Sequence, residues 1–375
     1  MTTIKDIFCE FGPEYLARHG GRIPSEHRQV IHAILRCRSG QFGFTIYHCQ
    51  HCGKHHLVNR SCGNRHCPNC QHHKTQQWLA KQTARALPAH HFLITFTVPE
   101  QVRGFIRSNQ HAAYHAMFQA SSAALKLLAK DERFIGTDLP GFVGVLHTWG
   151  RQLHYHPHIH YIVPGGGISK DRTRWLASRQ DFYLPVKALS RIYRAKFRDA
   201  MKQAGLLERI DSTVWSAGWN VDSKAVGDSE TSLQYVAPYV FKVAISDNRI
   251  LTVEHRTVTF RYREHGSNRS RTTSLDVLEF IRRFLQHVLP HGFVKVRHYG
   301  FLAANCALSI DAIRHLIDTH SGLRSPQTLL ETLTPPAPRC PNCGGPLIPL
   351  YSILPTSNGQ PLCLPSRTPA FSDTG

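Results

Sequence analysis

A run of alternating histidines near the middle of the chain restricts its local structure more than any other feature. Residues 154–161 read His-Tyr-His-Pro-His-Ile-His-Tyr. In an extended strand alternate side chains share one face, so His158 and His160 would point together while Ile159 packs into a core. Two neutral imidazoles placed in this way can bind one divalent metal ion. The sequence therefore predicts a strand at residues 158–163 with a metal site on one face.

The flanking residues favour a metal site over a solvated strand face, which is the ordinary interpretation of an isolated pair of alternate histidines. Residues 142–149 predict a neighbouring strand. Because Pro157 has no N–H for a sheet hydrogen bond, we expect the regular strand to begin at His158, which leaves His154 and His156 as accessories. An open site that accepts phosphate oxygen would hold Mg²⁺ or Mn²⁺. The third ligand is open among His156, His147, Gln152 and Gln234.

Two tyrosines four residues apart form a second candidate group. Tyr235 and Tyr239 would lie on one face of a helix, with Lys242 about one turn further along. An ammonium group nearby would stabilise a phenolate or a phosphate oxygen. A phenol, whose free pKa is about 10, needs such help to act as a nucleophile at neutral pH. The alternative is an aromatic stripe that packs against the core.

Two C-x-x-C pairs lie within a short Gly/His/Cys-rich block. Each pair can direct two thiolates at one ion, and two pairs complete a tetrahedron. We therefore predict one structural Zn²⁺ bound by Cys49, Cys52, Cys67 and Cys70. Four thiolates leave no open position for catalysis, and unligated surface thiols would invite oxidation. The spacing leaves five other residues as possible substitutes or supporting groups, namely Cys62, His66, His51, His55 and His56.

A third C-x-x-C pair lies near the end of the chain. Cys340 and Cys343 provide half of a metal site, which Cys306 or Cys363 could complete. An unmetallated turn is an equal alternative, because the chain beyond Thr334 is rich in proline.

The charge of the chain points to a polyanionic partner. There are 45 Lys and Arg against 25 Asp and Glu, a formal net charge of +20. Such a field attracts nucleic acid first and an anionic membrane surface second. Arg60 and Arg65 in the cysteine block, and Arg261 and Arg263 on the outer face of an alternating strand at residues 257–263, are the predicted DNA contacts. With no signal peptide and no apolar stretch of about 20 residues, we expect a cytoplasmic, DNA-associated protein.

Helical periodicity and β-rich runs alternate irregularly along the chain, which predicts an α+β fold. We expect domains at residues 1–88 (helical and zinc-binding), 89–304 (catalytic) and 305–375 (a helical segment with a proline-rich tail). The expected helices are 26–37, 75–87, 189–204 and 275–289, the last capped by Thr273 or Ser274, and the expected strands are 92–98, 142–149, 158–163 and 257–263.

Several motifs in collinear order resemble the rolling-circle transposases of bacterial insertion sequences, the two-tyrosine branch of the HUH endonucleases. The resemblance spans roughly residues 49–303. It is carried by Cys-Pro-Asn-Cys-Gln at 67–71, His-Thr-Trp-Gly at 147–150, His-Pro-His-Ile-His at 156–160, the tyrosine segment at 235–246 and Arg-His-Tyr-Gly-Phe-Leu-Ala at 297–303.

This resemblance implies a central antiparallel sheet that presents His158 and His160 as metal ligands, and a helix that carries Tyr235 and Tyr239 as nucleophiles. It implies cleavage of single-stranded DNA at transposon ends, giving a 5′-phosphotyrosine and a free 3′-hydroxyl without a nucleotide cofactor. One departure is Pro238, where the family usually has another residue. Proline removes a helix hydrogen bond outside the first turn, so we favour Tyr239 over Tyr235 as the nucleophile.

Three other functions share part of these features. A plasmid replication initiator or a relaxase would use the same chemistry on another substrate. A non-catalytic, zinc-dependent DNA-binding regulator would need the cysteines and the charge, but neither the histidine strand nor the tyrosines. A metal phosphodiesterase would use an activated water in place of tyrosine.

Overall fold

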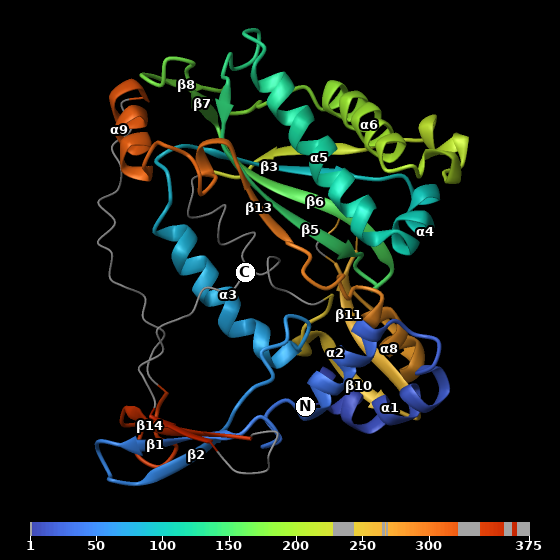
Figure 1. The fold of residues 1–375 in the computed structure, drawn as a ribbon, viewed down its shortest axis with the longest axis vertical. Helices are drawn as coiled ribbons and strands as arrows, with labels where there is room; N and C mark the ends of the chain where they lie inside the picture. Colours follow the sequence, from blue (N-terminus) through green and yellow to red (C-terminus); the bar gives the residue numbers. More distant parts are fainter. Residues whose placement is uncertain are drawn as a thin grey trace.

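A five-stranded sheet forms the centre of the molecule (Figure 1). The computed structural model describes residues 2–227, 244–264, 267, 269–321, 338–355 and 362–365. Each neighbouring pair in the sheet is antiparallel, in the order β13-β5-β6-β3-β9. This confirms the predicted α+β class with a central antiparallel sheet. The strands are β3 (His91–Thr97), β5 (Phe142–Trp149), β6 (Tyr155–Pro164), β9 (Val221–Ala225) and β13 (Val296–Tyr299).

The histidine strand begins earlier than its proline suggested. β6 starts at Tyr155 rather than at His158. Its pairing with β3 covers only the part from His158 onward, and its pairing with β5 has an irregularity between His147 and Trp149. Pro157 therefore lies where no regular ladder hydrogen bond is required of it, as expected for a proline at a bulge.

Two helices cover one face of this sheet, α5 (Gln110–Ala129) and α6 (Val186–Gln203). They pack against each other and bury the apolar alternate residues of the strands, among them Phe96 on β3 and Ile159 and Tyr161 on β6. Gly144 faces the Tyr161 ring, where an added Cβ would lie 2.5 Å from a ring carbon. The opposite face of β6 consequently presents His158 and His160. A shorter helix, α4 (Glu100–Ser108), precedes α5.

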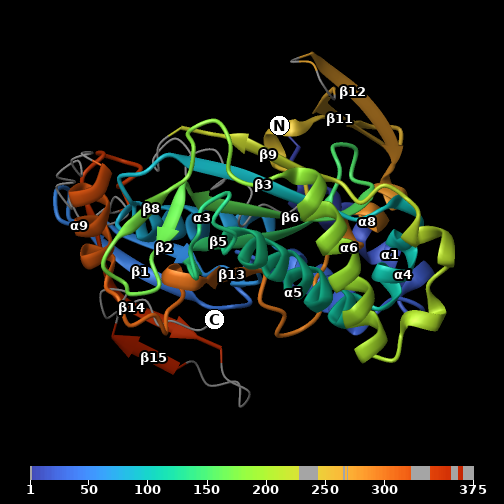
Figure 2. The same ribbon diagram turned by 90° about the horizontal axis from the view of Figure 1, so that it is seen from above.

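A second body combines the start of the chain with residues 244–288. Ile7 and Phe8 from the first helix pack in one core with Phe260 and Phe284. The domain boundaries proposed at residues 88 and 304 remain a prediction. Hydrophobic cores cross both boundaries, because residues before 88 pack with residues 244–288, and residues 87 and 89 pack with residues 313 and 317. Figure 2 shows the β11–β12 ribbon projecting from this body. Its elements are α1 (Ile4–His19), α2 (Ser25–Arg36), β10 (Ile250–Glu254), β11 (Thr257–Arg263), β12 (Ser270–Asp276) and α8 (Val277–Leu285).

The expected helix at residues 275–289 is shorter at both ends. The Asp276 side chain accepts hydrogen bonds from the backbone N–H groups of Leu278 and Glu279, so Asp276 is the N-cap in place of Thr273 or Ser274. The two predicted caps lie in β12 because its pairing with β11 continues to Asp276. β11 itself has the predicted bounds and alternation, with Val258 and Phe260 buried.

The remaining elements surround these two bodies. Helix α3 begins at Pro68, seven residues before the expected start, and its Trp78 and Leu79 pack over the face of the central sheet opposite α5. In the described part of the chain, no helix has both the length and the apolar character that a membrane span requires. The elements are α3 (Pro68–Thr83), α9 (Ile310–Ser321), β1 (Phe44–Cys49), β2 (His55–Asn59), β14 (Leu347–Leu354), β15 (Leu362–Pro365), β4 (Leu139–Pro140), β7 (Gly166–Ile168) and β8 (Trp175–Ala177).

A buried histidine joins the two bodies and makes their packing sensitive to acid. His287 follows α8 and is 4% exposed. Its Nε2 lies 3.2 Å from the Leu153 carbonyl oxygen, and its Nδ1 lies 3.2 Å from the Thr148 hydroxyl. Burial lowers the pKa of His287 to about 3, so the folded protein keeps this imidazole neutral.

We expect acid to destabilise the fold through His287. Below about pH 6.5, the ordinary pKa of histidine, His287 is protonated in the unfolded chain but stays neutral in the folded protein. The free energy of unfolding therefore falls as the pH drops from about 6.5 towards about 3. Between pH 7 and pH 5 the loss is about 2 kcal/mol. Urea unfolding at both pH values should show this loss reduced in His287→Gln and unchanged in the surface control His32→Gln. Equal pH dependence in the wild type and His287→Gln would contradict it.

Candidate active site

Three histidines converge on the open face of the central sheet. His147 on β5 pairs in register with His158 on β6, and His160 follows two residues later on the same face. Their ligand nitrogens lie within 4.8 Å of one another. The ring centroids are 4.6 Å apart for His147 and His160 and 4.7 Å apart for His158 and His160. Of the four candidates for the third ligand, the structure brings His147 to the predicted pair.

Hydrogen bonds orient two of these rings. His158 Nδ1 lies 2.7 Å from the His156 carbonyl oxygen, so this nitrogen is the N–H donor. His160 Nδ1 lies 2.8 Å from the hydroxyl of Thr95, the residue opposite it on β3. When Nδ1 carries the proton, the lone pair of Nε2 is free to bind a metal. The His156 carbonyl favours this tautomer for His158, and the Thr95 hydroxyl is placed to pair with Nδ1 of His160 in the same tautomer.

Burial keeps the site uncharged. Desolvation lowers the pKa of His158 to about 4 and that of His160 well below its ordinary value. Both imidazoles are thus neutral at physiological pH, which is the form that binds metal.

The other sequence candidates lie elsewhere. His156 is outside the three-histidine group, and His154 lies in the tight turn before β6, where its carbonyl accepts the Gly150 N–H. The Gln152 carbonyl accepts a hydrogen bond from Arg283. Four predicted residues lie outside the described residues, namely Gln234, Tyr235, Tyr239 and Lys242.

A cleft of about 660 Å³ opens beside the histidines, between the sheet, α3 and the second body. The Trp149 ring, which lines it, stacks on His147 with centroids 4.8 Å apart and an interplanar angle of 22°. The Lys295 ammonium lies 4.9 Å from the Trp149 ring centroid. Burial, with a smaller contribution from Arg65, lowers the pKa of Lys295 to about 7. The cleft thus combines an aromatic wall with a titratable cation, features that the sequence analysis did not identify.

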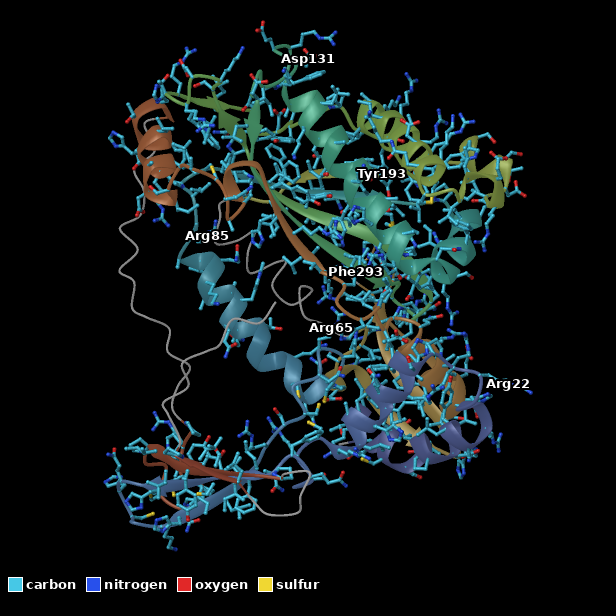
Figure 3. The ribbon with its side chains drawn as sticks, in the orientation of Figure 1. Arg22, Arg65, Arg85, Asp131, Tyr193 and Phe293 are labelled. Atoms are coloured by element: carbon cyan, nitrogen blue, oxygen red, sulfur yellow. The ribbon has the colours of Figure 1, made fainter. Side chains whose placement is uncertain are left out.

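The predicted DNA-binding arginines have different surroundings. The Arg65 guanidinium donates hydrogen bonds to the carbonyls of Pro290 and Phe293, each at 2.6 Å (Figure 3). These bonds hold the loop before β13 against the segment that precedes α3. Arg60 is exposed. Arg261 and Arg263 are exposed at the end of β11, where the Arg151 guanidinium donates to the Arg263 carbonyl. Within the described ranges, no carboxylate forms an ion pair with Arg261 or Arg263. These two arginines therefore lie beside the loop that leads into the histidine strand.

The four predicted zinc ligands do not form one site. The Sγ atoms of Cys49 and Cys52 lie with those of Cys340 and Cys343. Cys67 and Cys70 lie instead with Cys37 and Cys62, and Cys70 Sγ is 3.7 Å from Cys37 Sγ and 3.5 Å from Cys62 Sγ. The predicted grouping is therefore wrong, because Cys49 and Cys52 flank the turn after β1 whereas Cys67 and Cys70 begin α3. Neither Cys306 nor Cys363 belongs to these groups.

The second body contributes to one of these cysteine groups. Cys37 directly follows α2, and Cys62 lies in the segment that leads to α3. This group therefore connects the second body, through Cys37, to the start of α3, through Cys67 and Cys70. Cys37 is an isolated cysteine in the sequence, so no spacing motif identifies it.

Comparison with known proteins agrees with this architecture. Residues 141–309 match the family described as "Putative transposase" (Y2_Tnp), and residues 7–98 match the "Transposase zinc-binding domain" of the IS91 type. The "Putative transposase y4qJ" of Sinorhizobium fredii is 37% identical over 320 residues, which cover 80% of each chain. The "Transposase for insertion sequence element IS801" of Pseudomonas savastanoi pv. phaseolicola is 26% identical over 293 residues, 73% of this chain and 70% of that protein. No solved structure matches the chain.

These matches confirm the resemblance found in the sequence. They cover both the cysteine-rich part and the part that carries the histidine strand, and they assign a DNA-directed activity to a chain of high positive charge. The chain belongs to the IS91/IS801-type family of insertion-sequence transposases, with a zinc-binding domain at its N-terminal side.

Proposed function

We propose that this transposase nicks and joins single-stranded DNA at the ends of its element through a 5′-phosphotyrosine intermediate. The observation that carries the proposal is the convergence of His147, His158 and His160 on one point of an open sheet face. A site of neutral nitrogen donors beside a cleft with a cationic side chain is suited to a phosphodiester. A replication initiator or a relaxase would share this chemistry, but the transposase relatives favour transposon ends.

The proposed reaction conserves the energy of the phosphodiester bond. The phenolate oxygen of Tyr239 or Tyr235 attacks the phosphorus, the bond from phosphorus to the 3′ oxygen breaks, and that oxygen takes up a proton. The 5′ phosphate remains on the tyrosine. Attack by another 3′-hydroxyl reverses these steps and joins the strands, so no nucleotide cofactor is needed. Lys242 would stabilise the phenolate.

The three imidazoles fit a divalent ion that keeps open positions for water or phosphate oxygen. Between the two predicted ions, nitrogen donors favour Mn²⁺ over Mg²⁺. Such an ion would polarise the scissile phosphate and offset the charge that develops on its oxygens.

The surrounding cations suggest a path for the strand. Arg261 and Arg263 lie beside the β5–β6 loop, and Lys295 lines the cleft. Phosphate contacts of this kind position a strand without reading its sequence. We therefore place the strand between the β11–β12 ribbon and the cleft.

We expect a covalent protein-DNA adduct when the protein is incubated with a single-stranded oligonucleotide of the element's end and Mn²⁺. Denaturing gels should show the adduct in the wild type and in His32→Ala, and its loss in the double variant Tyr235→Phe/Tyr239→Phe. His160→Ala should cleave at least about 100-fold more slowly, because a metal ligand is lost. Cleavage without an adduct would support a water-using hydrolase, and no cleavage would support a regulator.

Thr95 is expected to position His160. Thr95→Val keeps the shape of the side chain but removes the hydroxyl that pairs with His160 Nδ1 at 2.8 Å. Loss of such a partner should raise the Mn²⁺ concentration for half-maximal cleavage by about 10- to 100-fold. Thr97→Val is the matched control, since Thr97 lies on the same strand face opposite His158. An equal change in both variants would indicate a general effect on β3 instead.

Lys295 is expected to bind phosphate in its protonated form. Its pKa of about 7 means that charge is lost as the pH rises through neutrality, so single-strand affinity should fall between pH 6 and pH 8. Lys295→Met should bind about tenfold more weakly at pH 6 and lose this pH dependence. Fluorescence anisotropy with a labelled oligonucleotide measures both effects. The control is Lys130→Met, which removes an exposed cation paired with Asp138, and identical binding by wild type and Lys295→Met would refute the role.

A further inference from the structure

Two cysteine turns at opposite ends of the sequence have the same backbone geometry. In the first, the Gly53 N–H donates to the Cys49 carbonyl and the Cys49 N–H donates to the Lys54 carbonyl, at 3.0 and 2.9 Å. In the second, the Gly344 N–H donates to the Cys340 carbonyl and the Cys340 N–H donates to the Gly345 carbonyl, both at 2.8 Å. Gly53 and Gly344 have φ values of +70° and +72°. Both turns are Cys-x-x-Cys-Gly, where glycine supplies the left-handed conformation.

The third pair lacks this glycine and folds differently. Residues 67–70 and 340–343 have the same sequence, Cys-Pro-Asn-Cys, but Gln71 follows the first and Gly344 follows the second. Without glycine the chain continues into α3, with proline at the first helical position. The residue after the second cysteine thus distinguishes the two turns from the helix start, and the structure brings these two turns together.

The sulfur positions match a tetrahedral ion. Cys49 Sγ lies 3.5 Å from Cys343 Sγ, and Cys52 Sγ lies 3.8 Å from Cys340 Sγ. Tetrahedral zinc with a Zn–S distance of about 2.3 Å separates its sulfurs by about 3.8 Å, whereas a disulfide would need about 2.05 Å. An added Cβ on Gly345 would lie 3.3 Å from the sulfurs of both Cys49 and Cys343. Gly345 therefore lets the backbone approach these sulfurs closely, and the His56 Nε2 lies 3.2 Å from Cys340 Sγ at the margin of the group.

The sheet around these turns has very little core of its own. β14 pairs with β1 through residues Leu347 to Ile353, and β15 and β2 form the edges. The buried residues here are Cys49, Cys340 and Leu347, with Tyr47 partly buried against them. Leu57, Ile348, Leu350, Leu362 and Leu364 remain exposed. Four short strands with so small a core need a metal or another cross-link to hold them together.

We propose that Cys340 and Cys343 complete a structural zinc site with Cys49 and Cys52, so that one ion fixes the C-terminal strands to the N-terminal hairpin. The group Cys37, Cys62, Cys67 and Cys70 is then a separate site, and the chain binds two zinc ions. Residues 338–365 lie outside both matched family regions, and this site makes them part of the zinc-binding module. Metal binding displaces the thiol protons and supplies folding energy that the small core lacks.

Zinc content per chain tests the assignment directly. The purified full-length protein should contain two zinc ions by elemental analysis. The double variant Cys340→Ser/Cys343→Ser should retain one, and so should Cys67→Ser/Cys70→Ser, because each leaves the other group intact. Cys363→Ser is the matched control, an exposed cysteine on β15 outside the cluster, and should retain two. One ion in the wild type, unchanged by loss of Cys340 and Cys343, would overturn the proposal.

Limited proteolysis provides a readout that does not depend on metal content. In Cys49→Ser/Cys52→Ser the C-terminal strands keep their sequence but lose their anchor, so cleavage within residues 338–365 should accelerate at least about tenfold. The same acceleration should follow chelation of zinc from the wild type. In Cys363→Ser cleavage should match the wild type. Unchanged cleavage in the Cys49→Ser/Cys52→Ser variant would show that the strands are held without this ion and would refute the proposal.

Discussion

The register between β6 and its neighbours determines most of the functional geometry. Because side chains alternate, the pairing that buries Ile159 and Tyr161 beneath α5 and α6 must turn His158 and His160 to the other face. A shift by one residue would place the imidazoles in the apolar core and the aromatic ring in the cleft. The hydrophobic core therefore specifies where the three histidines meet, although none of them belongs to that core. The same register sets His147 opposite His158 and Thr95 opposite His160.

Charge is distributed in a way that suits a polyanionic substrate. Burial keeps His158 and His160 neutral, so the point where a metal would bind adds no positive charge before the ion arrives. The permanent charges of Arg261 and Arg263 lie at the margin, on the exposed β11–β12 ribbon, and the titratable Lys295 lines the cleft. A chain of net charge +20 can thus attract DNA over a wide surface and still keep His158 and His160 uncharged. Neutral ligands and peripheral cations also avoid mutual repulsion at the site.

Local sequence patterns predicted local structure well and distant groupings poorly. The bounds of β5 follow from a β-rich run and those of β11 from hydrophobic alternation, and the central antiparallel sheet follows from the resemblance. The cysteine grouping failed because C-x-x-C spacing states which two thiolates share a turn, but not which turns meet in space. Cys340 approaches Cys52 only after the chain has passed through both bodies. A local signal did exist, since glycine follows Cys52 and Cys343 but not Cys70. His147 was one of four candidates, and only strand pairing distinguishes it.

The described residues on either side of positions 228–243 belong to different bodies. On one side, the carbonyl of Gly227 accepts the His91 N–H at the edge of the central sheet. On the other side, Ala244 and Ile245 are buried in the core that α1, α2 and α8 share. The β5–β6 loop connects these bodies, because β5 and β6 belong to the central sheet whereas Leu153 packs in the second core and its carbonyl pairs with Gln286 and His287 of the second body. Gly227 is therefore bonded to the sheet that presents the histidines, whereas Ala244 and Ile245 are packed in the second body. The contacts of the β5–β6 loop with the second core hold these two parts of the chain together.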